Sequence, residues 1–221
     1  MGRGLFGILG PPMIGPSSSH TAGAARIGLM CRSIVQADIA EVTFFLHGSF
    51  ANTYKGHGTD RALVGGLMGM QPDDERIIRS LDVAKKEKIK INFVKTDLGN
   101  VHPNTVEAVI TSKNGETASI VASSIGGGEI NLVSINGFHA DLSGNYNAII
   151  VRHKDKVGMI SKITNMFEKN NINIVSLSNN REKKGQTAIT IIEMDGELSP
   201  NMLTDISKTA DIYSVSNINK I

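Results

Sequence analysis

Residues 147–169, with the sequence NAIIVRHKDKVGMISKITNMFEK, decide the fold of the last third of the chain. The apolar run that ends at His153 is typical of a buried strand, and Gly158 allows a tight turn after it. The segment 157–169 has apolar residues near helical spacing, namely Ile160, Ile163, Met166 and Phe167. This spacing predicts an amphipathic helix that follows the strand directly.

The segments that follow repeat this alternation to the C-terminus. Apolar and β-branched runs predict strands at 172–178, 187–194 and 212–218, and a helix is expected at 203–209. The resulting order β-α-β-β-α-β is that of a ferredoxin-like domain. Small polar residues at 141–145 mark a boundary, so we expect two domains, 1–144 and 145–221.

The N-terminal domain is predicted to mix helices and strands after an initial loop at Gly10–Pro16. The pair Asn114-Gly115 between two apolar runs is a strong hairpin signal. The expected elements are helices at 20–37, 59–70 and 73–86 and strands at 39–47, 89–94, 104–111, 117–124 and 129–135. The chain is therefore predicted to be α+β, with an α/β domain followed by a ferredoxin-like domain.

The amino-acid composition excludes several classes of protein. The chain has 221 residues, a formal net charge of +2 and a single cysteine, Cys31. One cysteine excludes an internal disulfide, and we expect no metal ligands in this chain. The balanced charge gives no reason to expect nucleic-acid binding, and no apolar stretch reaches the roughly 18 residues of a membrane span. The N-terminus lacks a signal-peptide pattern, so a cytoplasmic protein is expected.

The densest group of reactive side chains lies in the segment Gly15–Gly23, which precedes or opens a helix. Its polar residues are Ser17, Ser18, Ser19, His20 and Thr21. Hydroxyl groups donate to a carboxylate or accept from an ammonium group, and an imidazole transfers protons near neutral pH. The segment is therefore a candidate substrate site. The alternative is that Ser18 or Ser19 only caps the helix.

Three further segments carry weaker signals. The stretch 55–61 offers Lys55, Gly56, His57, Gly58, Thr59, Asp60 and Arg61, which suit a shaped anion-binding loop or merely a polar turn. Pro103 favours extended geometry at His102, so that His102 and Asn104 point to one site, unless this histidine is structural. The glycines at 126–128 allow close approach of a ligand, or form a β-bulge.

Taken in order, these four segments resemble the β part of iron–sulfur L-serine dehydratases, and the resemblance covers nearly the whole chain. It implies conversion of L-serine to pyruvate and ammonia, with a [4Fe-4S] cluster as Lewis acid. A cluster needs several thiolates, and this chain has only Cys31. The resemblance therefore implies a two-chain enzyme in which a cysteine-rich α subunit holds the cluster.

The resemblance also implies roles for individual residues. The residues that it implies in substrate binding come from the first three segments. They are Ser17, Ser18, Ser19, Thr21, Lys55, Gly56, Gly58, Thr59, Asp60, His102 and Asn104. His20 and His57 are the acid–base candidates, and neither is preferred. The alternative hypothesis for the whole chain is a non-catalytic amino-acid sensor, because a sensor also needs hydrogen-bond donors for an anion.

The entry 153–160 resembles that of ACT domains, and the N-terminal domain resembles the allosteric substrate-binding domain of 3-phosphoglycerate dehydrogenases. In those enzymes the ACT domain binds L-serine across a subunit interface. His153 and Asn173 match that motif, and Asp155 replaces an asparagine. The resemblance implies either an L-serine effector site at these three residues or an ACT domain that serves only self-association.

Overall fold

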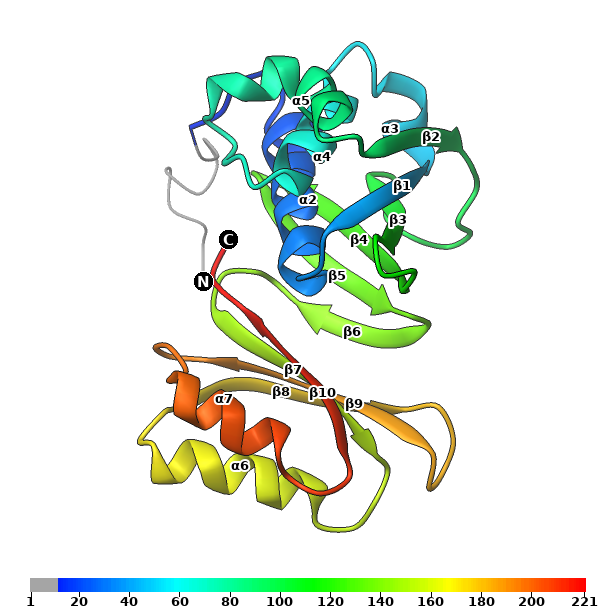
Figure 1. Cartoon of the computed structure of the whole chain (residues 1–221). Helices are drawn as coiled ribbons and strands as arrows, with labels where there is room; N and C mark the ends of the chain where they lie inside the picture. The colour runs from blue at the N-terminus through cyan, green and yellow to red at the C-terminus, as the bar shows by residue number, and fades with distance from the viewer. Residues whose placement is uncertain (1–11) are drawn as a thin grey trace. The chain divides into compact units, whose positions relative to one another are not determined.

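The computed structural model describes residues 12–221 and divides into two compact units, one ending at Asn136 and one spanning Gly137–Ile221 (Figure 1). The sequence placed the domain boundary after residue 144, and the difference is strand β6 (Phe138–Leu142), which the sequence analysis did not anticipate. The predicted loop Gly10–Pro16 lies partly outside the described residues, and residues 12–16 form neither helix nor strand. Within the described part of the chain, no helix has the length and apolarity needed to cross a membrane.

The first unit is built on a sheet in which neighbouring strands run in the order β2-β1-β3-β4-β5. These strands are β1 (Ile39–Leu46), β2 (Lys90–Lys95), β3 (Thr105–Ser112), β4 (Thr117–Gly126) and β5 (Glu129–Ile135). The pair β1–β2 is parallel and the other pairs are antiparallel. The predicted hairpin is confirmed, with Gly115 at a φ of 87° in its turn.

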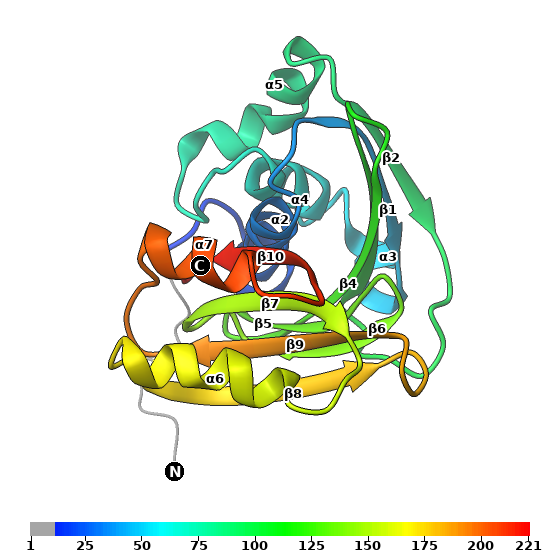
Figure 2. The same cartoon turned by 60° about the horizontal axis from the view of Figure 1, so that its bottom comes forward.

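The helical segments of the first unit are η1 (Ser18–Ala22), α2 (Gly23–Ile34), α3 (Gly48–Thr53), α4 (Thr59–Leu67), η2 (Glu75–Arg79) and α5 (Ser80–Lys86). Helix α2 contacts β4 and β5, and Figure 2 shows α2 and α4 side by side against the sheet. Val42, Phe44 and Leu46 of β1 are fully buried, so alternate residues of this strand form part of the core. The sequence analysis missed α3, because six residues are too few to establish a helical repeat.

Helices α2 and α4 approach each other through glycines. A methyl group added to Gly66 would lie 1.9 Å from the carbonyl oxygen of Ala25, and one added to Gly28 would lie 2.3 Å from that of Leu63. Backbone therefore packs against backbone at both positions, and neither glycine leaves room for a side chain. This contact fixes the position of the two helices relative to each other.

The second unit contains the predicted β-α-β-β-α-β order. Its elements are β7 (Asn147–Lys154), α6 (Met159–Lys169), β8 (Ile174–Arg181), β9 (Thr187–Met194), α7 (Pro200–Ser207) and β10 (Ile212–Ile218), with sheet order β10-β7-β9-β8. All of its strand pairs are antiparallel, as a ferredoxin-like sheet requires. The predicted fold class, α+β with a ferredoxin-like C-terminal domain, is confirmed.

One detail of the predicted helix differs in α6. The spacing groups Ile160 with Ile163, Met166 and Phe167 on one side, but Ile160 is 40% exposed, whereas Met159, Ile163 and Phe167 are buried. The helix begins at Met159, after Gly158 with its φ of 87°. Met159, Ile163 and Phe167 follow the i, i+4 spacing of one helix face, and Ile160 lies at the edge of that face.

The glycine contact between α2 and α4 gives a stability prediction. Gly66→Ala should lower the free energy of unfolding by about 2–3 kcal/mol, because its methyl group meets rigid backbone. Gly65→Ala is the matched control in the same helix, since its methyl group would meet the Ile77 side chain at 2.8 Å rather than backbone, and a side chain can shift more easily than a helix backbone. Urea unfolding midpoints of the full chain measure both variants, and equal losses would contradict the role of the backbone contact.

Candidate active site

The predicted Ser-His segment forms a single π-helical turn, η1, that continues directly into α2. The Ser17 hydroxyl accepts a hydrogen bond from the His20 backbone N–H at 3.2 Å and thereby caps the turn. The cap is thus the residue before the two serines that the capping alternative considered. Ser18 and Ser19 lie within the turn and are not needed as caps.

The His20 ring is held on both of its nitrogens. Its Nδ1 lies 3.0 Å from the Ser19 hydroxyl, and its Nε2 lies 2.9 Å from the Ser49 hydroxyl. The ring makes edge contacts with Phe50, at 5.4 Å between centroids, and with His57, at 4.9 Å. The two predicted acid–base histidines are therefore neighbours, although 37 positions separate them in the sequence.

The loop before α4 brings His57 to this position. The Thr21 hydroxyl donates to the His57 carbonyl at 3.2 Å, and Gly58, at a φ of 69°, turns the chain into α4. The His57 Nδ1 is buried and has no hydrogen-bond partner, and the same holds for the hydroxyl of the fully buried Thr59. Both atoms are therefore ready to bond a polar group that enters the site.

A second pair of unsatisfied atoms lies where β3 begins and β4 ends. The Asn104 Oδ1 and the Ser124 hydroxyl are buried without partners, while the backbone N–H of Ser124 donates to the Asn104 carbonyl at 2.9 Å. A methyl group on Gly23 would lie 2.0 Å from the Ser124 hydroxyl, so this hydroxyl lies against the first turn of α2. Glycine at position 23 makes room for it.

These orphaned atoms are the most informative property of the site. Among residues 12–221, five buried side-chain polar atoms lack a partner, and four of them belong to His57, Thr59, Asn104 and Ser124. Folded proteins leave few such atoms unpaired, because each costs about 1–3 kcal/mol. Their concentration beside His20 indicates a site that a small polar ligand completes.

Other predicted site residues do not bond to this cluster. Lys55 is exposed, with its ammonium 5.8 Å from the centre of the Tyr54 ring, and Gly56 is exposed as well. Asp60 accepts from the Arg61 backbone N–H at 2.8 Å. The exposed His102 uses its Nδ1 to accept from the Asn104 backbone N–H at 3.1 Å. The predicted convergence of His102 and Asn104 side chains is therefore not observed.

The sequence analysis missed Ser49, and it did not assign Ser124 to the site. Ser49 opens α3 immediately after the buried strand β1, in the short segment His47-Gly48-Ser49. A Gly-Ser pair after a buried strand is a common turn signal, so it offered no reason to single out the serine. The useful signal was its position, because strand ends often carry site residues.

Burial sets the protonation of the histidine pair and of the cysteine. Burial first, and the nearby His57 second, lower the pKa of His20 below its ordinary value of 6.5. His20 is therefore largely neutral at pH 7. Burial raises the pKa of the Cys31 thiol to about 12, so this sulfur is protonated and is a poor metal ligand.

The described residues do not fit an iron–sulfur cluster. No three His, Cys, Asp or Glu side chains come together between residues 12 and 221 in a way that suits a metal ion. Cys31 lies fully buried inside α2. Residues 12–221 therefore offer no set of ligands that would hold such a group.

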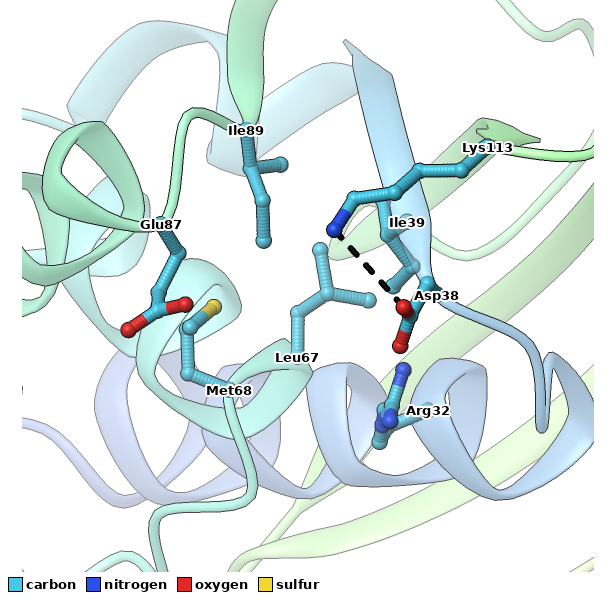
Figure 3. Close-up of a pocket in the computed structure, with 8 residues that line it drawn as sticks. All are labelled: Arg32, Asp38, Ile39, Leu67, Met68, Glu87, Ile89 and Lys113. Atoms are coloured by element: carbon cyan, nitrogen blue, oxygen red, sulfur yellow. Dashed lines mark ion pairs between the residues drawn. The ribbon is translucent and has the colours of Figure 1, made fainter.

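A cavity of about 200 Å³ opens at the other end of α2 and α4 (Figure 3). Its lining residues are Arg32, Asp38, Ile39, Leu67, Met68, Glu87, Ile89 and Lys113. Asp38 and Lys113 form an ion pair at 3.7 Å on its rim. None of the predicted site residues lines this cavity, so it is distinct from the histidine cluster.

The three predicted effector residues in the second unit are each engaged within the chain. The buried His153 bonds the Lys154 carbonyl and the Thr190 hydroxyl, each at 2.8 Å. Asp155 accepts from the Gly185 N–H at 2.8 Å and from Arg181 at 3.1 Å, and these bonds lower the pKa of its carboxyl.

The same three residues do not form one site within a single chain. Asn173 donates to Asp195 at 2.9 Å, next to the end of β9 where Met194 pairs with Ile174. His153 pairs with Ala188 near the start of β9. Six residues of strand separate these ends, a span of roughly 20 Å. A ligand that touches both residues therefore needs a second copy of the domain.

The fold and the site define a two-unit protein in which an α/β domain with a Ser–His cluster precedes a ferredoxin-like domain of the ACT kind. Residues 9–88 match the family described as serine dehydratase beta chain, and residues 147–211 match the ACT domain. The chain is 44% identical over 216 residues to a probable L-serine dehydratase beta chain of Bacillus subtilis, covering 98% of both chains.

Two other relatives extend this comparison. The L-serine dehydratase beta chain of Peptoniphilus asaccharolyticus is 43% identical over 202 residues, which is 91% of each chain. A D-3-phosphoglycerate dehydrogenase of Bacillus subtilis is 23% identical over 88% of this chain and 37% of its own length, in agreement with the predicted likeness of the fold. The chain belongs to the family of L-serine dehydratase beta chains.

The histidine pair gives a prediction about pH. In a proton NMR titration of the full chain, His20 should titrate below pH 6.5, so that its folded form resists protonation as the pH falls. Stability linked to neutral His20 is complete above about pH 6.5 and declines as the pH falls toward the lowered pKa. His57→Gln should raise the His20 pKa only partway, because burial is the larger cause. Full recovery to 6.5 would contradict this order of causes.

Proposed function

We propose that this chain is the β subunit of a two-chain L-serine ammonia-lyase that converts L-serine to pyruvate and ammonia, and that it is active only with an α subunit. The concentration of unsatisfied buried atoms beside two adjacent histidines supports this proposal most directly. The names of the beta-chain relatives that cover 91–98% of this chain support the reaction class.

The substrate binds among the hydroxyls of the first turn and the orphaned atoms around it. Serine presents a carboxylate that accepts hydrogen bonds and an ammonium that donates them. The hydroxyls of Ser17, Ser18, Ser19 and Thr59 offer donors for the carboxylate. The Thr21 hydroxyl already donates to the His57 carbonyl, so it can accept from the ammonium. The Asn104 Oδ1 has only acceptor capacity, so it suits the ammonium. Five other predicted residues make their contacts outside the cluster, so we place them at its edge rather than in direct contact with the substrate. They are Lys55, Gly56, Gly58, Asp60 and His102.

His57 is the better candidate for the base that removes the α-proton. Its Nδ1 has no partner, whereas both nitrogens of His20 already face serine hydroxyls. A general base needs a free lone pair within hydrogen-bond reach of the proton that it accepts. His20, kept neutral by burial, then holds the serine hydroxyls in place and limits the accumulation of positive charge beside His57.

The iron–sulfur cluster belongs to the partner in this proposal. A cysteine-rich α subunit holds the [4Fe-4S] cluster, which as a Lewis acid assists departure of the serine hydroxyl. The single protonated Cys31 supports a location outside this chain. Oxidation-sensitive clusters and a lone unpaired cysteine both suit the reducing cytoplasm.

Reconstitution with a partner tests the proposed function. The chain should produce no pyruvate from L-serine alone, and should do so after anaerobic assembly with a cysteine-rich α chain and iron. In the assembled enzyme, His57→Asn should lower kcat by about 10²–10⁴-fold without preventing assembly, because it removes the proposed base.

The control for this experiment is Val157→Ala, a change at a fully exposed position of the second unit, which should retain wild-type turnover. Assembly is measured by co-purification. Capture of no cysteine-rich chain, together with tight binding of L-serine by this chain alone, would favour an amino-acid sensor over an enzyme subunit.

The ACT domain is proposed to self-associate and to bind L-serine between two copies, because His153 and Asn173 lie too far apart to share a ligand within one chain. L-serine should therefore lower the dissociation constant of the dimer in sedimentation experiments on the full chain. Asn173→Ala should abolish this effect of L-serine, whereas Lys86→Ala, a change at an exposed position of the first unit, should not. A dimer that is indifferent to L-serine would leave the domain with a role in self-association alone.

A further inference from the structure

We propose that Ser49 is a positioning residue that holds the ring of His20 in one orientation. Its catalytic consequence rests on the proposed function, but its structural consequence can be measured in this chain alone. Neither the four sequence segments nor the family description of the first unit singles out this serine.

The hydrogen bonds of the His20 ring require two partners of opposite character. A neutral imidazole has one N–H and one lone pair, so one nitrogen donates and the other accepts. Ser19 lies 3.0 Å from Nδ1 and Ser49 lies 2.9 Å from Nε2. Whichever serine accepts, the other must donate, and a serine hydroxyl can do either. Removal of Ser49 leaves Nε2 without this partner, so that the ring is held by hydrogen bonds at Nδ1 alone.

Ser49 suits this role because its backbone is fixed on both sides. Its N–H donates to the Pro103 carbonyl at 2.8 Å, and its own carbonyl accepts from the Thr53 hydroxyl at 2.8 Å. Gly48, at a φ of 54°, lies so close that a methyl group there would be 2.7 Å from the Pro103 carbonyl oxygen. The backbone from which the short Ser49 side chain projects is therefore fixed.

This arrangement gives the His102-Pro103-Asn104 segment a role that differs from the predicted one. The His102 side chain is exposed and bonds within its own segment. The Pro103 carbonyl instead holds Ser49, and Ser49 holds His20 across the site. The segment thus contributes to the histidine cluster through a backbone carbonyl, which a search for reactive side chains does not detect.

The other neighbours of His20 do not hold its Nε2. The Ser17 hydroxyl lies 3.4 Å from Nδ1, the nitrogen that Ser19 also faces. Phe50 and His57 contact the ring at centroid distances of 5.4 and 4.9 Å, and such edge contacts restrict its tilt. The Ser49 hydroxyl is the group that bonds Nε2.

NMR of the full-length chain tests the positioning role directly. NOESY spectra at pH 7.5 should show contacts between the His20 ring protons and the rings of Phe50 and His57 in the wild type. Ser49→Ala should weaken these contacts because Nε2 loses the hydroxyl that holds it, and Ser49→Thr should restore them because it keeps the hydroxyl. Ser214→Ala, at an exposed position of the second unit, is the control and should match the wild type. Unchanged ring contacts in Ser49→Ala overturn the proposal.

Kinetics of the assembled enzyme test the consequence for catalysis. Ser49→Ala should lower kcat about tenfold with little change in KM and should alter the acidic limb of its pH profile, while Ser49→Thr retains most activity. Unchanged kcat and an unchanged pH profile in Ser49→Ala contradict the catalytic consequence. An inactive wild-type assembly contradicts the proposed function instead, and the NMR result then still decides the role of Ser49.

Discussion

The close contact between α2 and α4 is the constraint on which the site depends. At Gly28 and Gly66 the two helices touch backbone to backbone, so their positions cannot be adjusted without loss of packing. Each helix begins at one of the histidine segments, and η1 contacts α4. The distance between His20 and His57 is therefore set by a contact several residues away from either ring. Preorganised sites depend on such rigid supports, because small displacements weaken hydrogen bonds steeply.

The site is assembled from segments with different kinds of support. A helical turn supplies His20, a loop with a left-handed glycine supplies His57, and strand ends supply Asn104 and Ser124. Four of the five buried polar atoms that lack partners among residues 12–221 belong to these segments, and the fifth, the Ser178 hydroxyl, lies in β8. A ligand that bonds several of these atoms would link the segments to one another. Binding should therefore stabilise the first unit as a whole.

Much of the fold and part of the site could be predicted from the sequence. The strands of the ferredoxin-like domain and the hairpin at Asn114-Gly115 follow from apolar alternation and turn chemistry, which are local properties. The family resemblance named His20 and His57 as acid–base candidates, and their ring centroids lie 4.9 Å apart. Ser49 could not be predicted, because its partner lies 29 positions away and its anchor is a carbonyl oxygen, which every residue possesses. β6 was missed because five residues give too short a pattern.

Because the Cys31 thiol is buried, thiol labelling can be used to study a two-chain complex. Its sulfur is fully buried and protonated at all physiological pH values, so alkylating reagents should not modify it while the chain stays folded. Mass-tagging of a native complex would then count reactive thiols on the other polypeptide without background from this one. A tag on Cys31 would in turn report that the core of the first unit had opened.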